Sequence, residues 1–134
     1  MKKHVSIMAL VLLGVAGSAA AAGPYDVSVD APAGKAKERA VARISLRPKG
    51  PFHVNVDYPT KLSMKAPDGV KIEREVQRGA EALKFEKGAL DFEVGFTADG
   101  AGTKSFTGEL KFAVCTDTEC KPTTEKLAFD VQVK

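Results

Sequence analysis

The sequence predicts an all-β domain folded as a β-sandwich, and three observations lead to this class. Short segments in which apolar and polar residues alternate recur along the chain at the spacing typical of sandwich strands. Turn signals rich in proline and glycine separate these segments. No internal repeat, low-complexity tract or linker interrupts the pattern, so we expect a single domain.

The first half of the chain contains five alternating segments, because β-strands direct successive side chains to opposite faces of a sheet. Their apolar positions are Tyr25, Val27 and Val29; Ala42, Ile44 and Leu46; Phe52, Val54 and Val56; Leu62 and Met64; and Val70 and Ile72. Breaks at residues 32–35, 48–51, 58–59 and 67–69 separate them. In the second break, Pro48 and Pro51 each fix φ on either side of Gly50, which is typical of a turn.

Residues 73–82 are the least patterned part of the chain. A short helical turn is one possibility, but Gly79 and the lack of an apolar stripe favour a loop. Alternation resumes at Leu83 and Phe85 and continues through residues 90–96. A turn at residues 98–103 then precedes the last two predicted strands.

Both cysteines of the chain lie at the junction of these last two strands. One face of the first strand carries Phe106, Gly108, Leu110, Phe112 and Val114, and one face of the second carries Leu127, Phe129, Val131 and Val133. This pattern predicts a β-hairpin with Cys115 as the last residue of the outgoing strand and Cys120 in the connection. We therefore expect a dithiol or a disulfide at the rim of a sheet.

The first 22 residues have the three parts of an export signal. Lys2, Lys3 and His4 precede an apolar run at residues 5–15, and small residues follow as far as Ala22. We predict cleavage after Ala22, with Ala20 and Ala21 as alternative last residues of the signal. Cleavage after Ala22 leaves residues 23–134 as the mature domain, without a transmembrane segment and located in the periplasm or secreted. Loss of the two lysines lowers the formal charge from +3 to +1. A nearly neutral chain gives no reason to expect a nucleic-acid partner.

Export brings two cysteines five positions apart into an oxidising compartment, where they tend to pair. A structural disulfide is one interpretation, although closing a ring of six residues removes only about 2 kcal/mol of chain entropy from the unfolded state. A redox-active pair is the other, because exchange needs one approachable sulfur and a second thiol that resolves the mixed disulfide. Asp117 and Glu119 disfavour a thiolate and Lys121 favours one, so the local charges leave both alternatives open.

A zinc site is a third interpretation of the cysteine pair. Zinc usually takes four ligands, and His53 is the one histidine of the predicted mature chain, so Asp or Glu would have to complete the set. His53 also invites a Cys-His nucleophile, but nothing in the sequence places it near either sulfur, and a solvated strand histidine is the commoner case. We therefore predict no metal and no organic cofactor.

The window from Phe112 to Pro122, FAVCTDTECKP, resembles the cysteine motif of the amino-terminal domain of the periplasmic thiol:disulfide interchange protein DsbD. The segment from Lys49 to Pro59, KGPFHVNVDYP, is similar to a second segment of that family, and residues 67–70 are similar to one of its turns. The resemblance extends from about Ala40 to Val133.

The resemblance implies an immunoglobulin-like β-sandwich whose cysteines cycle between dithiol and disulfide. It also implies that Cys120 forms the mixed disulfide with a partner and that Cys115 resolves it. Expected partners are a thioredoxin-like or membrane thiol-disulfide oxidoreductase and exported substrate proteins. The family shields its cysteines with an aromatic cap loop roughly where residues 76–83 lie, but this chain has no aromatic residue there. The family's domain is normally fused to a membrane electron conduit, whereas the sequence here ends at Lys134. If the domain is a relay, we expect its electrons to come from a separate protein. A non-catalytic interaction domain with a structural Cys115–Cys120 bond is the alternative.

Overall fold

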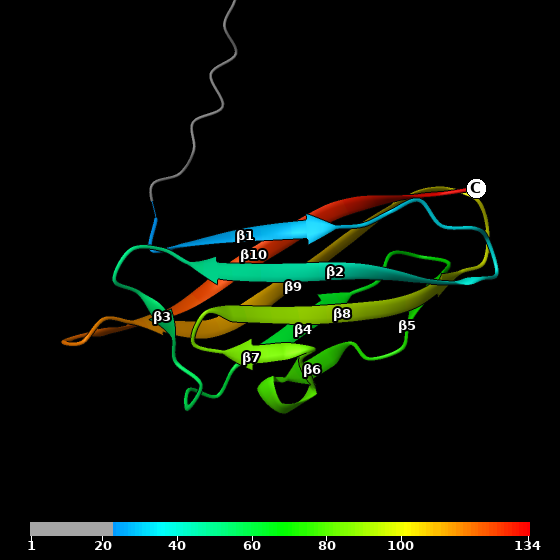
Figure 1. The fold of residues 1–134 in the computed structure, drawn as a ribbon. Helices are drawn as coiled ribbons and strands as arrows, with labels where there is room; N and C mark the ends of the chain where they lie inside the picture. The colour runs from blue at the N-terminus through cyan, green and yellow to red at the C-terminus, as the bar shows by residue number, and fades with distance from the viewer. Residues whose placement is uncertain (1–22) are drawn as a thin grey trace, which may run out of the picture.

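The fold is a sandwich of two antiparallel sheets, seen in the computed structural model, which describes residues 23–134 (Figure 1). Sheet A has the order β1-β2-β8-β5, and β7 also pairs with β8. Its strands are β1 (Tyr25–Asp30), β2 (Arg39–Pro48), β5 (Val70–Ile72), β7 (Lys84–Glu86) and β8 (Ala89–Ala98). Sheet B has the order β10-β9-β4-β6, and β3 also pairs with β9. Its strands are β3 (His53–Val54), β4 (Lys61–Lys65), β6 (Val76–Arg78), β9 (Gly102–Cys115) and β10 (Cys120–Val133). The all-β prediction is confirmed.

The order of the strands is that of an immunoglobulin-like sandwich. In that fold, strands A, B, E and D form one sheet and strands C, F and G form the other. Here β1, β2, β8 and β5 take the first set of places, and β4, β9 and β10 take the second. Strand β6 extends the second sheet beyond β4, and the D position is divided between β5 and β7, which both pair with β8.

The core forms where the apolar faces of the two sheets meet. The largest fully buried side chains include Phe92 and Phe96 from sheet A and Phe106 and Phe112 from sheet B. The rings of Phe96 and Phe106 meet edge to face across the sandwich, with centroids 4.8 Å apart. The alternation seen in the sequence is therefore the alternation between core and solvent.

The sheets are also joined at their edges by Tyr25 of β1 and Glu125 of β10. The Tyr25 hydroxyl donates a hydrogen bond of 2.6 Å to the Glu125 carboxylate. Burial, followed by this hydrogen bond, raises the pKa of Tyr25 to about 12, so the phenol stays protonated as a donor.

The predicted hairpin is present as β9 and β10, which pair over fourteen residues each (Figure 1). Cys115 ends β9, as predicted. Cys120 is the first residue of β10 rather than part of the connection, because pairing continues to the position directly opposite Cys115. Only residues 116–119 join the two strands.

Two local predictions were wrong. Residues 73–82 are not simply a loop, since they contain β6 and a 3-10 helix, η1 (Gly79–Glu81), in which the side chain of Glu81 accepts a hydrogen bond from the backbone of Arg78. The alternating set at residues 52–56 yields only the two-residue strand β3, and Val56 is 38% exposed. Pairing with the end of β9 is too short to hold a longer strand at this position.

The predicted signal peptide, residues 1–22, lies outside the described residues. Among residues 23–134, no helix is long and apolar enough to cross a membrane.

The ion pair between Arg47 and Asp91 makes the stability of the fold depend on pH. Arg47 binds both carboxylate oxygens of Asp91, at 2.6 and 3.0 Å, and this hydrogen bonding lowers the pKa of the largely buried Asp91. A depressed pKa contributes stability that is present above the unfolded pKa of about 3.9 and is lost as the pH falls through the folded value. Urea unfolding between pH 5 and pH 2 should therefore show a smaller loss of stability in Asp91→Asn than in the wild type.

The matched control for this measurement is Asp68→Asn, which removes an exposed carboxylate from the turn at residues 67–69. It should keep the wild-type pH dependence. Parallel stability curves for Asp91→Asn and the wild type would contradict the role of the ion pair.

Candidate functional site: a disulfide at the end of a hairpin

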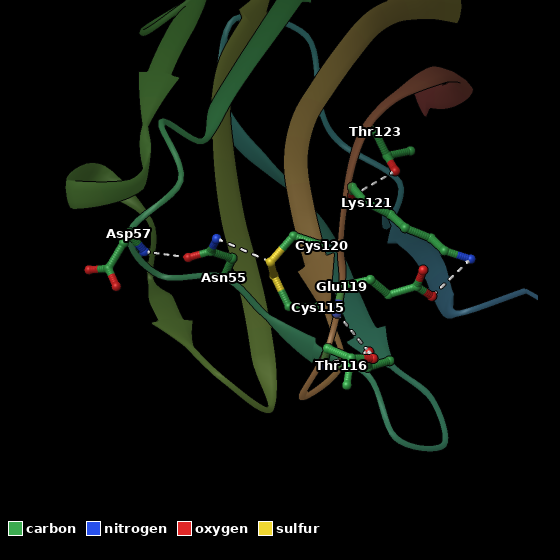
Figure 2. The surroundings of a disulfide bond; sticks show 9 residues. Asn55, Asp57, Cys115, Thr116, Glu119, Cys120, Lys121 and Thr123 are labelled. Carbon is green, nitrogen blue, oxygen red and sulfur yellow. Dashed lines mark hydrogen bonds and ion pairs between the residues drawn. A yellow bond between two sulfur atoms is a disulfide. The ribbon is translucent and has the colours of Figure 1, made fainter.

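Cys115 and Cys120 form a disulfide across the end of the β9/β10 hairpin (Figure 2). The two residues are directly opposite each other in the strand register, and their Cα atoms are 4.0 Å apart. Directly opposed residues of a non-hydrogen-bonded antiparallel pair lie at about 4.5 Å. The strand pairing therefore places the two cysteines directly opposite each other, where their sulfurs are joined.

The short connection holds the register of this pair. The backbone N–H of Thr116 donates a hydrogen bond of 2.8 Å to the carbonyl oxygen of Glu119, which continues the ladder one step beyond the disulfide. The Thr116 hydroxyl accepts hydrogen bonds from the backbone N–H groups of Thr118 and Glu119, at 3.4 and 3.3 Å. Only Asp117 and Thr118 lie beyond this pair, so the connection is a tight turn.

The two cysteines differ sharply in their access to solvent. Cys115 is 4% exposed, whereas Cys120 is exposed. Both side chains lie on the face of sheet B away from the core. Val114 and Phe112 of β9 point inward, so Cys115 points outward, and Cys120 is directly opposite Cys115 and shares its face. Cys115 is buried although it is on the outer face, as is its neighbour on that face, Ala113.

The segment that follows β3 runs along this end of β9. The backbone N–H of Asn55 donates a hydrogen bond of 2.9 Å to the carbonyl oxygen of Ala113. The side chain of Asn55 then points toward the disulfide, and its Nδ2 lies 3.9 Å from Cys120 Sγ (Figure 2). The sequence indicated only that Asn55 faces away from the core, so this contact was missed. Its one signal was the position of Asn55 inside the segment that resembles the DsbD family.

His53 lies beside Cys115, contrary to the expectation that nothing brings it near a sulfur. The register pairs His53 of β3 directly with Cys115 of β9. Directly paired residues project from the same face, with Cβ atoms about 4.5 to 5.5 Å apart. The structure therefore places Asn55 at one sulfur and His53 on the strand next to the other cysteine.

Charged side chains at the site are exposed and largely paired. Lys121 Nζ lies 3.8 Å from a Glu119 carboxylate oxygen and 5.3 Å from the centroid of the Phe52 ring. Both partners of the Lys121–Glu119 pair are about half exposed, so solvent weakens their mutual attraction. The mixed charges expected from the sequence are thus present beside Cys120, with Lys121 and Glu119 paired to each other.

The zinc interpretation finds no ligand set in residues 23–134. No group of three or more His, Cys, Asp or Glu side chains is arranged there to hold a metal ion. The cysteine sulfurs are joined to each other rather than present as thiolates, which are the form that binds zinc.

The region proposed as a cap by the DsbD resemblance does not lie next to β9. Strand β6 and the helix η1 that follows it are at the far edge of sheet B, with β4 between β6 and β9. The segment that contacts the disulfide is instead the one containing Asn55.

Comparison with known proteins leaves the family open. No family model matches the chain, and no curated protein matches it. Among solved structures, the chain is similar to a conjugative transposon lipoprotein from Bacteroides eggerthii, with 18% identity, coverage of 81% of this chain and 96% of that chain, and a TM-score of 0.46. It is also similar to a FixG-related protein from Vibrio parahaemolyticus, with 13% identity, coverage of 84% and 98%, and a TM-score of 0.45. AggA, the major subunit of aggregative adherence fimbriae type I from Escherichia coli, has 7% identity, coverage of 83% and 95%, and a TM-score of 0.43.

At these TM-scores the likenesses decide neither family nor function, and the fold assignment rests on the strand order. The resemblance to the DsbD domain stays a prediction. The structure contains a disulfide between Cys115 and Cys120, and such a bond persists in oxidising compartments outside the cytosol.

The disulfide should contribute little to the stability of the domain. It closes a ring of six residues, which constrains the unfolded chain by only about 2 kcal/mol. The double variant Cys115→Ser with Cys120→Ser should therefore still fold and should lose about 2 kcal/mol of unfolding free energy relative to the oxidised wild type. Urea unfolding followed by circular dichroism measures this loss.

The reduced wild-type protein is the control, because it lacks the bond but keeps both sulfur atoms. It should unfold at nearly the same urea concentration as the double variant. Failure of either protein to fold would show that the bond is required to hold the hairpin together.

Proposed function

We propose that the protein is an exported thiol-disulfide exchange module that passes reducing equivalents between partner proteins through Cys115 and Cys120, without a metal or organic cofactor. The observation that supports it is the unequal exposure of the pair, with Cys120 open to solvent and Cys115 buried. Exchange requires a thiolate to reach one sulfur in line with the bond that breaks. Cys120 Sγ is the sulfur that a second protein can approach.

The unequal exposure supports a different role for each cysteine in the proposed reaction. A thiolate of the electron donor attacks Cys120 Sγ, the bond between the two sulfurs breaks, and Cys115 leaves with the electron pair as a thiolate. The second thiolate of the donor then attacks the donor's sulfur in the mixed disulfide and releases Cys120 as a thiolate. The donor ends as a disulfide and the module as a dithiol, and the same steps in reverse reduce a substrate.

The proposed partners follow from this chemistry. The donor is a thioredoxin-like or membrane thiol-disulfide oxidoreductase, and the acceptors are exported proteins with disulfides. A location in the periplasm or outside the cell agrees with the formed bond and with the export signal predicted for residues 1–22.

A second candidate is a non-catalytic interaction domain in which Cys115–Cys120 is a structural disulfide. The specific observation in its favour is that the bond is formed between neighbouring strands in direct register. The formed bond by itself supports this candidate more directly than it supports exchange, since a structural role requires nothing else. The two candidates differ in how readily the bond is reduced and in whether a partner is captured.

The reduction potential separates the two candidates. Inert structural disulfides of exported proteins lie below about −300 mV, and exchangeable ones lie higher. Equilibration of the purified protein with dithiothreitol or glutathione buffers, read by thiol alkylation and mass spectrometry, should place this bond above about −300 mV because Cys120 is exposed. A value well below that limit would favour the structural candidate.

Trapping tests for a partner directly. In Cys115→Ala the resolving thiol is absent, so Cys120 should retain partners as mixed disulfides that reductant releases. The matched control is Cys120→Ala, which leaves only the buried Cys115 and should capture at least about tenfold less, because exchange depends on access to the attacked sulfur. If Cys115→Ala captures no more than the control from an extract of exported proteins, the exchange proposal fails.

A further inference from the structure

Asn55 is held with its side-chain N–H groups directed at Cys120. Its Oδ1 accepts a hydrogen bond of 2.9 Å from the backbone N–H of Asp57, which fixes the orientation of the amide (Figure 2). Oδ1 is therefore turned toward Asp57, and Nδ2 is turned toward Cys120 Sγ at 3.9 Å.

The backbone around Asn55 is held as firmly as its side chain. Its N–H donates to Ala113 of β9, and its carbonyl oxygen accepts a hydrogen bond of 3.3 Å from the backbone N–H of Tyr58. The donor is thus anchored to the same strand that carries Cys115. Its position relative to the sulfurs is set by the sheet and by a turn, and not by a freely rotating side chain.

A donor in this position interacts weakly with a disulfide and more strongly with a thiolate. Disulfide and thiol sulfurs are poor acceptors, whereas an ionised acceptor roughly doubles the strength of a hydrogen bond. The interaction therefore grows when negative charge develops on Cys120 Sγ. In the proposed exchange reaction, that charge appears when Cys120 leaves the donor, and it is present on the free thiolate until Cys120 attacks a substrate.

We propose that Asn55 is a positioning residue that stabilises the Cys120 thiolate through its side-chain N–H. This inference rests on the proposed exchange function for its biological meaning, but the interaction is a property of the sulfur and can be measured without a partner. Asn55 thereby assists Cys120, whose two neighbours on the chain, Glu119 and Lys121, carry charges of opposite sign to each other.

The charged and titratable groups around Cys120 do not offer the same contact as the Asn55 amide. Glu119 and Lys121 flank it on the chain and are ion-paired to each other. Asp117 lies in the exposed connection, Asp57 lies two residues after Asn55, and His53 is paired in register with Cys115. Among the described residues, the hydrogen bond from Asn55 is the side-chain donor contact that reaches Cys120 Sγ.

The test uses the Cys115→Ala background, so that Cys120 is the one thiol of residues 23–134 and its reactivity is read alone. The rate of alkylation by iodoacetamide between pH 5 and pH 10 reports the fraction of thiolate. Asn55→Asp keeps an oxygen that accepts the Asp57 N–H but replaces the donor with a negative charge. Its alkylation rate at pH 7 should fall about tenfold, with the pH midpoint shifted upward, because a like charge within about 4 to 6 Å disfavours the thiolate.

Asn55→Ala removes the donor without adding a charge and should lower the rate at pH 7 by about threefold to tenfold, the effect of losing one hydrogen bond of ordinary strength. The matched control is Gln132→Glu, which adds one negative charge near the opposite end of β10 while keeping an oxygen for Thr103. It should alkylate at the parent rate. Thermal unfolding of each variant checks that the fold is retained.

Equal rates for Asn55→Asp and the parent, or an equal fall in Gln132→Glu, would overturn the inference. A fall in Asn55→Asp together with an unchanged pH midpoint would also overturn it, since a structural change would alter access and not the thiolate fraction. These outcomes are independent of the trap. A working trap with no effect of Asn55 leaves exchange standing, and an effect of Asn55 with an empty trap leaves the sulfur chemistry without the function.

Discussion

The register of the β9/β10 hairpin is the constraint on which the site depends. Pairing over fourteen residues fixes which residue of one strand is opposite which residue of the other, and it ends with Cys115 opposite Cys120. A shift by one residue would place every side chain of a strand on the other face of the sheet. The same alternation that buries Phe106, Leu110 and Phe112 therefore also directs both sulfurs to the outer face.

A second segment completes the site without belonging to the hairpin. Residues 53–55 run beside the end of β9 and bring His53 and Asn55 to the two cysteines. Contact with this segment accompanies the burial of Ala113 and Cys115 on a face that is otherwise solvated. The unequal exposure of the two sulfurs, which carries the proposed function, is thus a product of three strands rather than of the cysteine motif alone.

The energetics of the site differ from those of the core. The sandwich is held together by aromatic and aliphatic side chains packed between the sheets, and a six-residue ring adds only about 2 kcal/mol to this. Opening the disulfide should therefore leave the strands paired. A bond that can open without unfolding the domain is compatible with repeated exchange, whereas a bond that carried the fold would not be.

The sequence by itself determined the sheet class, the faces of the strands and the position of Cys115 at the end of a strand, because period-two alternation follows directly from strand geometry. It failed at residues 73–82, where β6 and η1 form through pairing with β4 and local capping rather than through an apolar pattern. It also could not place His53 or Asn55, since both contacts join residues about 60 positions apart in the chain. Only the tertiary structure decided which sulfur is exposed, because burial on the outer face depends on a neighbouring segment that leaves no periodic signal in the sequence of the hairpin.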